Sequence, residues 1–262
     1  ANQNNSYAQY LLGEIYYLGK YIARNIIKSI YYLTSSANQN NSDAQCLLGE
    51  IYYKGEYISR DINKSIHYFK ESSCFYDSVA KNYLGIIYKN GDGVEKNTYF
   101  AKIYFKEAIK QKEESYSMYN LARIYYFGID MKRKISKAIS LLEKASKKHL
   151  FITDIFLFYI FSNCDDKIFQ NQKKSHQYLN KCPKYFRSQK HLINFNDNNS
   201  IQSIHKFLRD YDLIHSYDYL YDLLYFLLYG KFYDWKSTID NNAKANELRK
   251  DINTDFYEGF YD

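Results

Sequence analysis

The sequence opens with a stretch that it then repeats almost unchanged. ANQNNSYAQYLLGEIYYLG covers residues 1–19, and ANQNNSDAQCLLGEIYYKG covers residues 37–55, an offset of 36 residues. Only three aligned positions differ, Tyr7/Asp43, Tyr10/Cys46 and Leu18/Lys54. Near-identity at a fixed offset is typical of a repeat protein, in which each unit is one piece of supersecondary structure stacked on its neighbours.

The same period continues further along the chain. In the first segment of each unit, a leucine is followed four residues later by a tyrosine, and a glycine comes three residues after that. The leucines are Leu12, Leu48, Leu84 and Leu121, the tyrosines are Tyr16, Tyr52, Tyr88 and Tyr125, and the glycines are Gly19, Gly55, Gly91 and Gly128. The second segment has small residues on either side of an apolar run, at Ser29/Ser36, Ser65/Ser72, Ala101/Ala108 and Ala138/Ala145. A fifth unit keeps only this second pattern, from Ser175 to Cys182.

Each unit predicts two α-helices joined by a short turn. Ala8, Leu12 and Ile15 recur at helical spacing in the first segment, and Gly19 can adopt the left-handed backbone that ends many helices. The second segment begins at residues that can cap a helix, Asn25, Asp61 and Asn97, whereas the fourth unit has Lys134 there. One hairpin cannot bury its own apolar faces, so the pattern predicts hairpins stacked into an all-α solenoid.

These positions resemble the Sel-one-like repeat, a relative of the tetratricopeptide repeat. The shared pattern is A-x-x-x-L-G-x-x-Y-x-x-G followed by K-[AS]-x-x-x-[YFL]-x-x-[AS], and Gly91-Asp92-Gly93-Val94 is similar to the family's G-x-G-V loop. The resemblance extends roughly from Ala1 to Pro183. It implies a right-handed superhelix of helix–turn–helix repeats, and adaptors or scaffolds as the functional class, but it assigns no role to a particular residue.

The repeat signal predicts how the chain is organised. We expect four repeats within residues 1–148, at about 1–36, 37–72, 73–109 and 110–148, and a degenerate fifth at 149–183. The polar run NFNDNNS suggests a linker at 184–200, followed by a C-terminal helical cap or small helical domain at 201–262. The most apolar segments, LFITDIFLFYIF and YLYDLLYFLLYG, are shorter than the roughly 20 residues of a spanning helix, and an aspartate interrupts each. We therefore expect no membrane span.

Composition leaves nucleic-acid binding by a basic surface as an alternative. The formal net charge is +7, from 36 Lys and Arg against 29 Asp and Glu residues. Lysine is, however, enriched together with Asn, Ile, Tyr and Phe, which share A/T-rich codons. The densest basic run, Met131–Lys137, is short. We expect no nucleic-acid binding at physiological salt, where phosphate contacts weaken.

No residue pattern predicts catalysis, a cofactor or a metal site. Cys46, Cys74, Cys164 and Cys182 lack C-x-x-C spacing, so free thiols in a reducing compartment are expected, with the cytoplasm favoured. The histidines form no H-E-x-x-H, and NGDGVEK lacks the G-x-x-x-x-G-K-[ST] phosphate signature. The sequence therefore favours a non-catalytic adaptor. A regulatory repeat segment of a larger enzyme, or of a membrane-associated quality-control complex, is the other alternative.

The first helices supply candidate residues for binding a protein or peptide partner. One stripe, opposite the apolar face, varies from unit to unit while the core positions repeat, and in the tetratricopeptide geometry that the resemblance implies it lines the concave groove. The candidates are Tyr10, Glu14, Tyr17, Glu50, Tyr53, Lys89, Tyr119, Arg123 and Tyr126. Tyrosine and arginine are enriched among residues that dominate binding energy. The tyrosines one residue earlier than three of these, Tyr16, Tyr52 and Tyr125, are expected to lie in the core.

Overall fold

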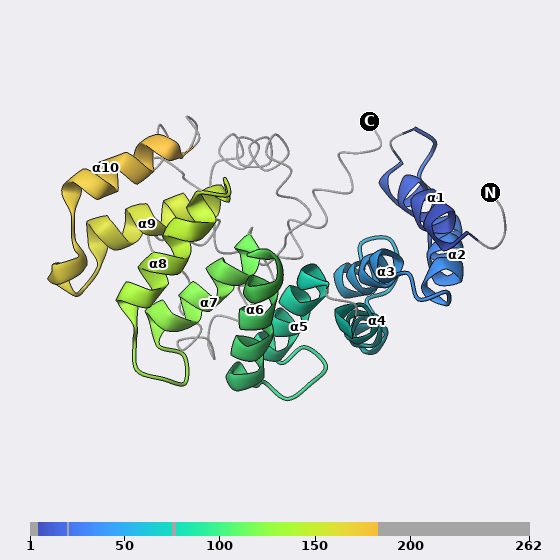
Figure 1. Cartoon of the computed structure of the whole chain (residues 1–262), viewed down its shortest axis with the longest axis horizontal. Coiled ribbons are helices and arrows are strands. Elements are labelled where there is room, and N and C mark those ends of the chain that lie inside the picture. Colours follow the sequence, from blue (N-terminus) through green and yellow to red (C-terminus); the bar gives the residue numbers. More distant parts are fainter. Residues whose placement is uncertain (1–4, 20, 75–76, 183–262) are drawn as a thin grey trace, which may run out of the picture. The chain divides into compact units, whose positions relative to one another are not determined.

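The structure is a computed structural model that describes residues 5–19, 21–74 and 77–182 (Figure 1). The linker expected at 184–200 and the helices expected at 201–262 lie outside the described residues. The chain divides into two compact units, Ala1–Thr153 and Asp154–Asp262. Each unit is described by itself below.

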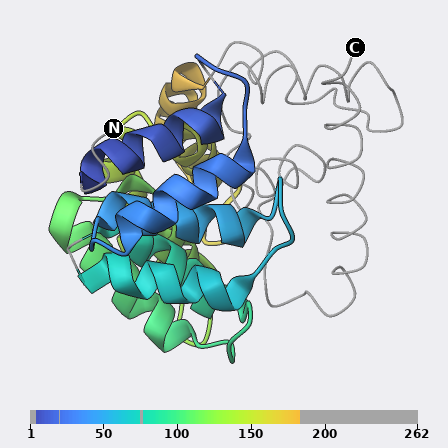
Figure 2. The same ribbon diagram turned by 90° about the vertical axis from the view of Figure 1, so that its right-hand side faces the viewer.

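The first unit contains helical hairpins that follow one another along the chain. The hairpins are α1 (Ser6–Leu18) with α2 (Ile26–Ala37), α3 (Ser42–Lys54) with α4 (Ile62–Cys74), α5 (Ser78–Asn90) with α6 (Thr98–Lys112), and α7 (Ser115–Phe127) with α8 (Ile135–Ser146). We number these hairpins repeats 1 to 4. The second helix of each repeat packs on the first helix of the next, so that α2 contacts α3, α4 contacts α5, and α6 contacts α7 (Figure 2). The described residues contain no strand, and the prediction of an all-α solenoid is confirmed.

The predicted capping residues set the helix ends. Asn25, Asp61 and Asn97 each accept, through Oδ1, the backbone N–H of the residue three positions on, at 2.9–3.0 Å. These bonds satisfy N–H groups that have no partner inside the helix. Lys134 makes no such bond at the start of α8, as expected from its side chain. The first helices end at glycines in the left-handed region, with φ of 65°, 64°, 80° and 65° at Gly19, Gly55, Gly91 and Gly128.

Small residues allow the two helices of a hairpin to approach closely. The Ser29 hydroxyl donates to the Gly13 carbonyl at 2.8 Å, and the Ser65 hydroxyl donates to the Gly49 carbonyl at 2.9 Å. At the other end of the same hairpins, Ser36 and Ser72 donate to backbone carbonyls of α1 and α3 at 2.6 and 2.9 Å. In these two hairpins each of the serines on the second helix therefore packs against the backbone of the first helix and forms a hydrogen bond to it.

The described part of the second unit continues the two-helix pattern. It consists of α9 (Phe151–Asn163), which begins at the end of the first unit, the short 3₁₀ helix η1 (Lys167–Phe169) and α10 (Gln172–Lys181). Asn171 caps α10 by accepting the Lys174 N–H at 2.9 Å, and Phe161 stacks on Tyr178 with ring centroids 5.8 Å apart. None of the helices in the described ranges has the length and apolar character needed to cross a membrane.

Candidate protein-interaction site on the first helices

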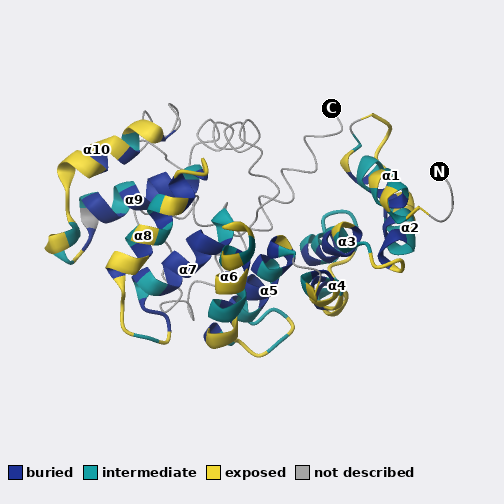
Figure 3. Cartoon of the chain, viewed as in Figure 1, coloured by how far each residue is buried: buried dark blue, intermediate teal, exposed yellow. Residues whose placement is uncertain are grey.

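The first helices of neighbouring repeats touch one another directly. Besides the contacts that the second helices make, the first helices contact one another: α1 contacts α3, α3 contacts α5, and α5 contacts α7. As a result α3, α5 and α7 are more buried than the second helices with which they pair (Figure 3). The stripe expected to line an open groove therefore lies partly between packed helices.

Six of the nine candidate binding residues are buried. These are Tyr17, Tyr53, Lys89, Tyr119, Arg123 and Tyr126, none of which exposes more than 8% of its surface. The other three, Tyr10, Glu14 and Glu50, are half-buried and belong to repeats 1 and 2. The expectation that this stripe lines an open groove does not hold at the six buried positions, because first helices that touch enclose the side chains between them.

The two sets of tyrosines exchange their expected environments. Tyr53 packs edge-on against Tyr83 of the next repeat, with ring centroids 5.5 Å apart. Tyr52, one residue earlier, is half-buried and stacks on Tyr68 of its own hairpin at 6.0 Å. Tyr16 and Tyr125 are likewise half-buried, so this set lies at the edge of the core, where Tyr52 packs against the buried cluster, and not in its interior.

Three of the buried tyrosines are each followed, seven residues later, by an arginine. This arginine lies after the turn of the hairpin and forms a hydrogen bond to the first helix. The Nε groups of Arg24, Arg60 and Arg133 donate to the carbonyls of Tyr17, Tyr53 and Tyr126 at 2.9, 2.8 and 2.8 Å. The guanidinium groups of Arg60 and Arg133 also lie 5.0 Å from the ring centres of Tyr53 and Tyr126. The recurrence of these arginines at the repeat period was the sequence signal for this contact, but spacing alone did not link them to the tyrosines.

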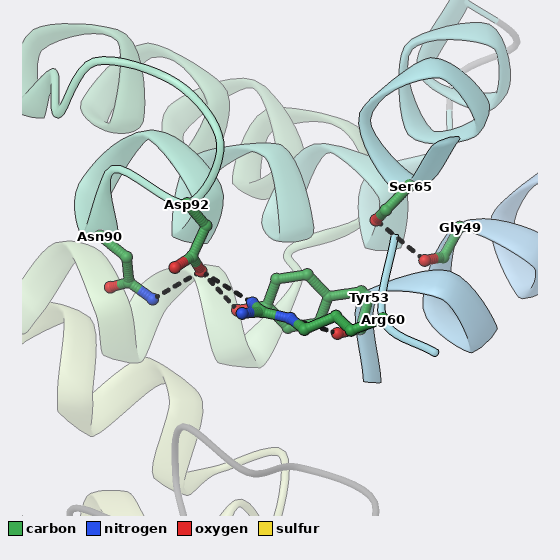
Figure 4. Close-up of polar contacts among 6 residues, drawn as sticks. All are labelled: Gly49, Tyr53, Arg60, Ser65, Asn90 and Asp92. Carbon is green, nitrogen blue, oxygen red and sulfur yellow. Dashed lines mark hydrogen bonds and ion pairs between the residues drawn. The ribbon is translucent and has the colours of Figure 1, made fainter. Parts of the chain in front are cut away.

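In repeat 2 the same contact reaches into repeat 3. Asp92 Oδ2 accepts the Tyr53 hydroxyl at 3.2 Å, and it lies 3.3 Å from both Arg60 and the Asn90 side-chain amide (Figure 4). A tyrosine, an arginine and an aspartate from two repeats therefore meet at one carboxylate. This cluster bridges the two repeats and leaves little of Tyr53 available to a partner.

The three accessible candidates and the exposed Asp43 make up what we call the acidic patch, on α1 and α3: Tyr10, Glu14, Asp43 and Glu50. The Tyr10 hydroxyl donates to Glu14 Oε1 at 2.8 Å, Glu50 forms an ion pair with Lys54 at 3.2 Å, and Asp43 is exposed. Sequence reasoning did not select Asp43, although it is one of the few positions at which the duplicated segments differ.

The pKa values of Tyr10, in the patch, and of Tyr17, near it, are raised by burial and then by the neighbouring carboxylates. Burial raises the pKa of Tyr10 well above its usual value of 10.0, and the carboxylates of Glu14 and then Asp43 raise it further. Burial also raises the pKa of Tyr17, and Glu56 and Glu50 add to that effect. Both phenols stay protonated at neutral pH, and the carboxylates that act on Tyr10 come from both first helices, Glu14 on α1 and Asp43 on α3.

The described residues hold little that could support other chemistry. Within residues 5–19, 21–74 and 77–182, no group of three or more His, Cys, Asp or Glu side chains is placed to bind a metal ion. Cys46 is buried, and this burial raises the pKa of its thiol well above the usual value. The nucleophilic form of cysteine is the thiolate, so this thiol is unreactive at neutral pH.

Stacked hairpins with this pattern of small residues, caps and turn glycines define an α-solenoid repeat protein. The profile of the Sel1 repeat matches residues 6–41, 42–74, 78–113 and 115–149, together more than half of the 262 residues. The chain belongs to the Sel1 repeat family. Sel1 repeats are typically a non-catalytic scaffold fold that mediates protein–protein interaction.

Solved structures of the same fold include bacterial proteins. A Sel1 repeat protein from Oxalobacter formigenes is 22% identical, with a TM-score of 0.61 over 68% of this chain and 72% of that chain. The protein c5321, described as a protective antigen present in uropathogenic Escherichia coli strains, is 17% identical, with a TM-score of 0.60 over 79% of this chain and 42% of that chain. At these identities the likeness concerns the fold alone. A search of curated proteins found no match.

Proposed function

We propose that this chain is a non-catalytic scaffold whose acidic patch on α1 and α3 binds a basic peptide or partner helix. The observation that carries the proposal is the grouping of Tyr10, Glu14, Asp43 and Glu50 on adjacent first helices, where they stay accessible while the rest of the predicted stripe is buried.

The chemistry of the patch suits a ligand with lysine or arginine side chains. Tyr10 offers an apolar ring and a hydroxyl on one rigid side chain, which is why tyrosine is common in binding sites. Carboxylates on both helices attract cations, and such complementarity favours fast and selective association. The positions in repeats 3 and 4 that align with Tyr10 and Glu14 are all buried, namely Asn82, Ile86, Tyr119 and Arg123. Binding is therefore proposed for repeats 1 and 2 only.

A displayed library of random 12-residue peptides, selected on the whole chain, tests this proposal. We expect enrichment of peptides that combine Lys or Arg with apolar residues, and affinities that fall as salt is raised. Glu14→Gln with Asp43→Asn should weaken binding of a selected peptide at least tenfold, because both changes remove a negative charge from the patch. The ion pair between Glu50 and Lys54 stays intact in this variant.

The control neutralises two exposed glutamates elsewhere, with Glu95→Gln and Glu107→Gln, the second of which also gives up an ion pair with Lys81 at 3.1 Å. Circular dichroism of both double variants checks that the helices are intact. Equal loss of affinity in the two variants would show that the peptide responds to overall charge and would reject the patch as the site.

A further inference from the structure

Repeat 3 exposes two aromatic rings at a place where the other repeats have a lysine. Tyr99 exposes 66% of its surface and Phe100 exposes 46%, next to each other in the first turn of α6. Because repeat 3 packs between repeats 2 and 4, these rings are not exposed merely by lying at an end of the chain. At the position of Phe100 the other units have Lys28, Lys64, Lys137 and Lys174.

The recurring lysine has a structural role that phenylalanine fills less well. Lys64 Nζ lies 5.0 Å from the ring centre of Tyr52, a contact that covers the ring while the charge stays in water. Phe100 makes the corresponding contact with Tyr88, at 5.5 Å between ring centres, but leaves almost half of an apolar side chain exposed. Packing alone therefore does not account for Phe100. A residue that breaks a local rule without a structural gain points to a functional site.

Exposed lysines follow the two aromatic residues along α6. Lys106 and Lys110 come seven and eleven residues after Tyr99, which places all three on one side of the helix. Two more exposed lysines, Lys137 and Lys144, lie on α8. None of these four lysines forms an ion pair with another described residue.

The second helices of repeats 3 and 4 are neighbours at both ends. The Thr98 hydroxyl, at the start of α6, donates to Asp130 in the turn before α8. Glu113, directly after α6, pairs with Lys148, just after α8, at 3.0 Å. The exposed side chains of the two helices therefore belong to one surface. We call it the lysine surface and define it as Tyr99, Phe100, Lys106, Lys110, Lys137 and Lys144.

The acidic residues of these helices do not neutralise the lysine surface. Each helix contains one, and Glu107 of α6 pairs with Lys81 at 3.1 Å, while Glu143 of α8 is half-buried. The stretch 131–149 has seven Lys and Arg residues against one glutamate, a net charge of +6 beside the +7 of the whole chain. The excess of positive charge is therefore concentrated in repeat 4, on and beside this surface.

We propose that the lysine surface binds an acidic peptide segment of a protein partner, with an aromatic or aliphatic residue at one end. Tyr99 and Phe100 receive this residue as an anchor, and the lysines pair with the Asp and Glu residues that follow it. From Tyr99 to Lys110 the helix rises about 16 Å, a distance that about five extended residues span. The acidic residues of the partner should therefore lie within this distance of its anchor.

The arrangement favours a peptide over a single-stranded nucleic acid. A nucleic-acid strand repeats base and phosphate at every nucleotide, so proteins that bind it place aromatic side chains along a basic groove. Here the exposed rings occur together at the start of α6, and α8, which is described throughout, exposes no large hydrophobic side chain. Mediating protein–protein interaction is also typical of Sel1 repeats. The lysine surface shares no residue with the acidic patch of repeats 1 and 2.

The displayed library of random 12-residue peptides, selected on the whole chain, also tests this surface. We expect a second class of enriched peptides besides the basic class, rich in Asp and Glu, with Phe, Tyr, Trp or Leu at one end of the acidic run. If no acidic class is enriched, the proposal is overturned, whereas the proposed function of the acidic patch is not affected.

Phe100→Lys separates the anchor from the charge for a selected acidic peptide. It places at this position the residue type of the other repeats, so the melting temperature should stay close to that of the wild type. Binding should weaken at least tenfold although the variant gains a positive charge, because the apolar anchor is lost. Tighter binding to Phe100→Lys would mean that charge alone holds the peptide and would overturn the proposal.

Lys106→Gln with Lys137→Gln should also weaken this peptide at least tenfold. The control, Lys70→Gln with Lys173→Gln, removes two exposed lysines from α4 and α10, and circular dichroism checks that both double variants keep their helices. Equal losses in the two would assign the binding to overall charge and overturn the site. A 12-nucleotide oligothymidine, or vesicles containing phosphatidylserine, that displaced the peptide more strongly than unlabelled peptide does would overturn the proposed occupant in favour of phosphates.

Discussion

Phe69 lies directly against the α-carbon of Gly49, so close that a Cβ atom added to the glycine would stand 2.6 Å from Phe69 Cδ1. The same relationship joins Gly85 to Phe105 and Gly13 to Leu33, where the added atom would be 2.5 Å away. In repeat 2 the Ser65–Gly49 hydrogen bond holds the two helices at this separation (Figure 4). Each of these hairpins therefore depends on a glycine in its first helix facing a large apolar residue in its second.

Gly49→Val should destabilise the chain because its side chain would push α4 away from α3. Overpacking of this kind typically costs about 1–3 kcal/mol in the free energy of unfolding, which urea denaturation followed by circular dichroism can measure. Lys70→Val is the control, since it places the same side chain at an exposed position of α4. A loss at Gly49 no larger than the loss at Lys70 would contradict the packing role, because valine forms helices better than glycine and propensity alone predicts no loss at position 49.

Tyr53→Ala should destabilise the protein more than Tyr52→Ala. Tyr53 is buried between repeats, and removing a buried aromatic side chain typically costs about 3–5 kcal/mol. Tyr52 is half-buried, so its truncation leaves a smaller cavity and one lost stacking contact with Tyr68. Melting temperatures of the two single variants provide the comparison. A larger loss for Tyr52→Ala would instead support the prediction from the sequence, in which Tyr52 lies in the core and Tyr53 faces the groove.

The repeats, the helix caps and the turn glycines could be predicted from the sequence because each depends on residues close together in the chain. Asn25 caps the helix it precedes, and Gly19 ends the helix it follows, whatever the neighbouring repeats do. Even the absence of a side-chain cap at Lys134 was visible in advance.

The environment of Tyr53 could not be predicted in the same way. Neighbouring helical residues such as Tyr52 and Tyr53 point about 100° apart, and the pattern placed Tyr52 on the core side and Tyr53 on the opposite stripe. The choice between them depends on how closely α3 approaches α5, which the pattern within a single hairpin does not contain. For the same reason the meeting of Tyr53 and Arg60 with Asp92 was not foreseen, because it joins two repeats.

The contact between Arg60 and Asp92 should couple repeats 2 and 3 weakly. Both side chains are partly exposed, so solvent screens the 3.3 Å ion pair. A double-mutant cycle with Arg60→Ala and Asp92→Ala should give a coupling energy of about 0.5 kcal/mol, and added salt should reduce it. Arg60→Lys should lose stability too, since lysine has no Nε group to donate to the Tyr53 carbonyl. A coupling energy of zero at low salt would mean that the ion pair between Arg60 and Asp92 makes no electrostatic contribution to stability.

Glu113 and Glu114 are adjacent in sequence, but their contributions to folding stability should change with pH in opposite directions. Burial raises the pKa of Glu114 above its ordinary value of 4.5, despite the N–H groups of Ser117 and Tyr116 that its carboxylate accepts at the start of α7. The ion pair with Lys148, whose Nζ lies 3.0 Å from Glu113 Oε2, lowers the pKa of Glu113 below 4.5.

The direction in which each glutamate changes the folding stability depends on whether the folded or the unfolded state binds its proton more tightly. At Glu114 the folded state does, so the stability that this group provides is complete below pH 4.5 and falls as the pH rises through the raised pKa. At Glu113 the unfolded state does, so its contribution is complete above pH 4.5 and is lost as the pH falls through the lowered pKa. Glu114→Gln should therefore gain on the wild type between pH 4 and pH 7, whereas Glu113→Gln should fall behind it over the same range. Free energies of unfolding from urea titrations at the two pH values measure both differences. If the Glu114→Gln difference were the same at both pH values, the carboxyl group would have to be solvated in the folded protein, and the cap of α7 would then resemble the exposed caps at Asn25 and Asp61.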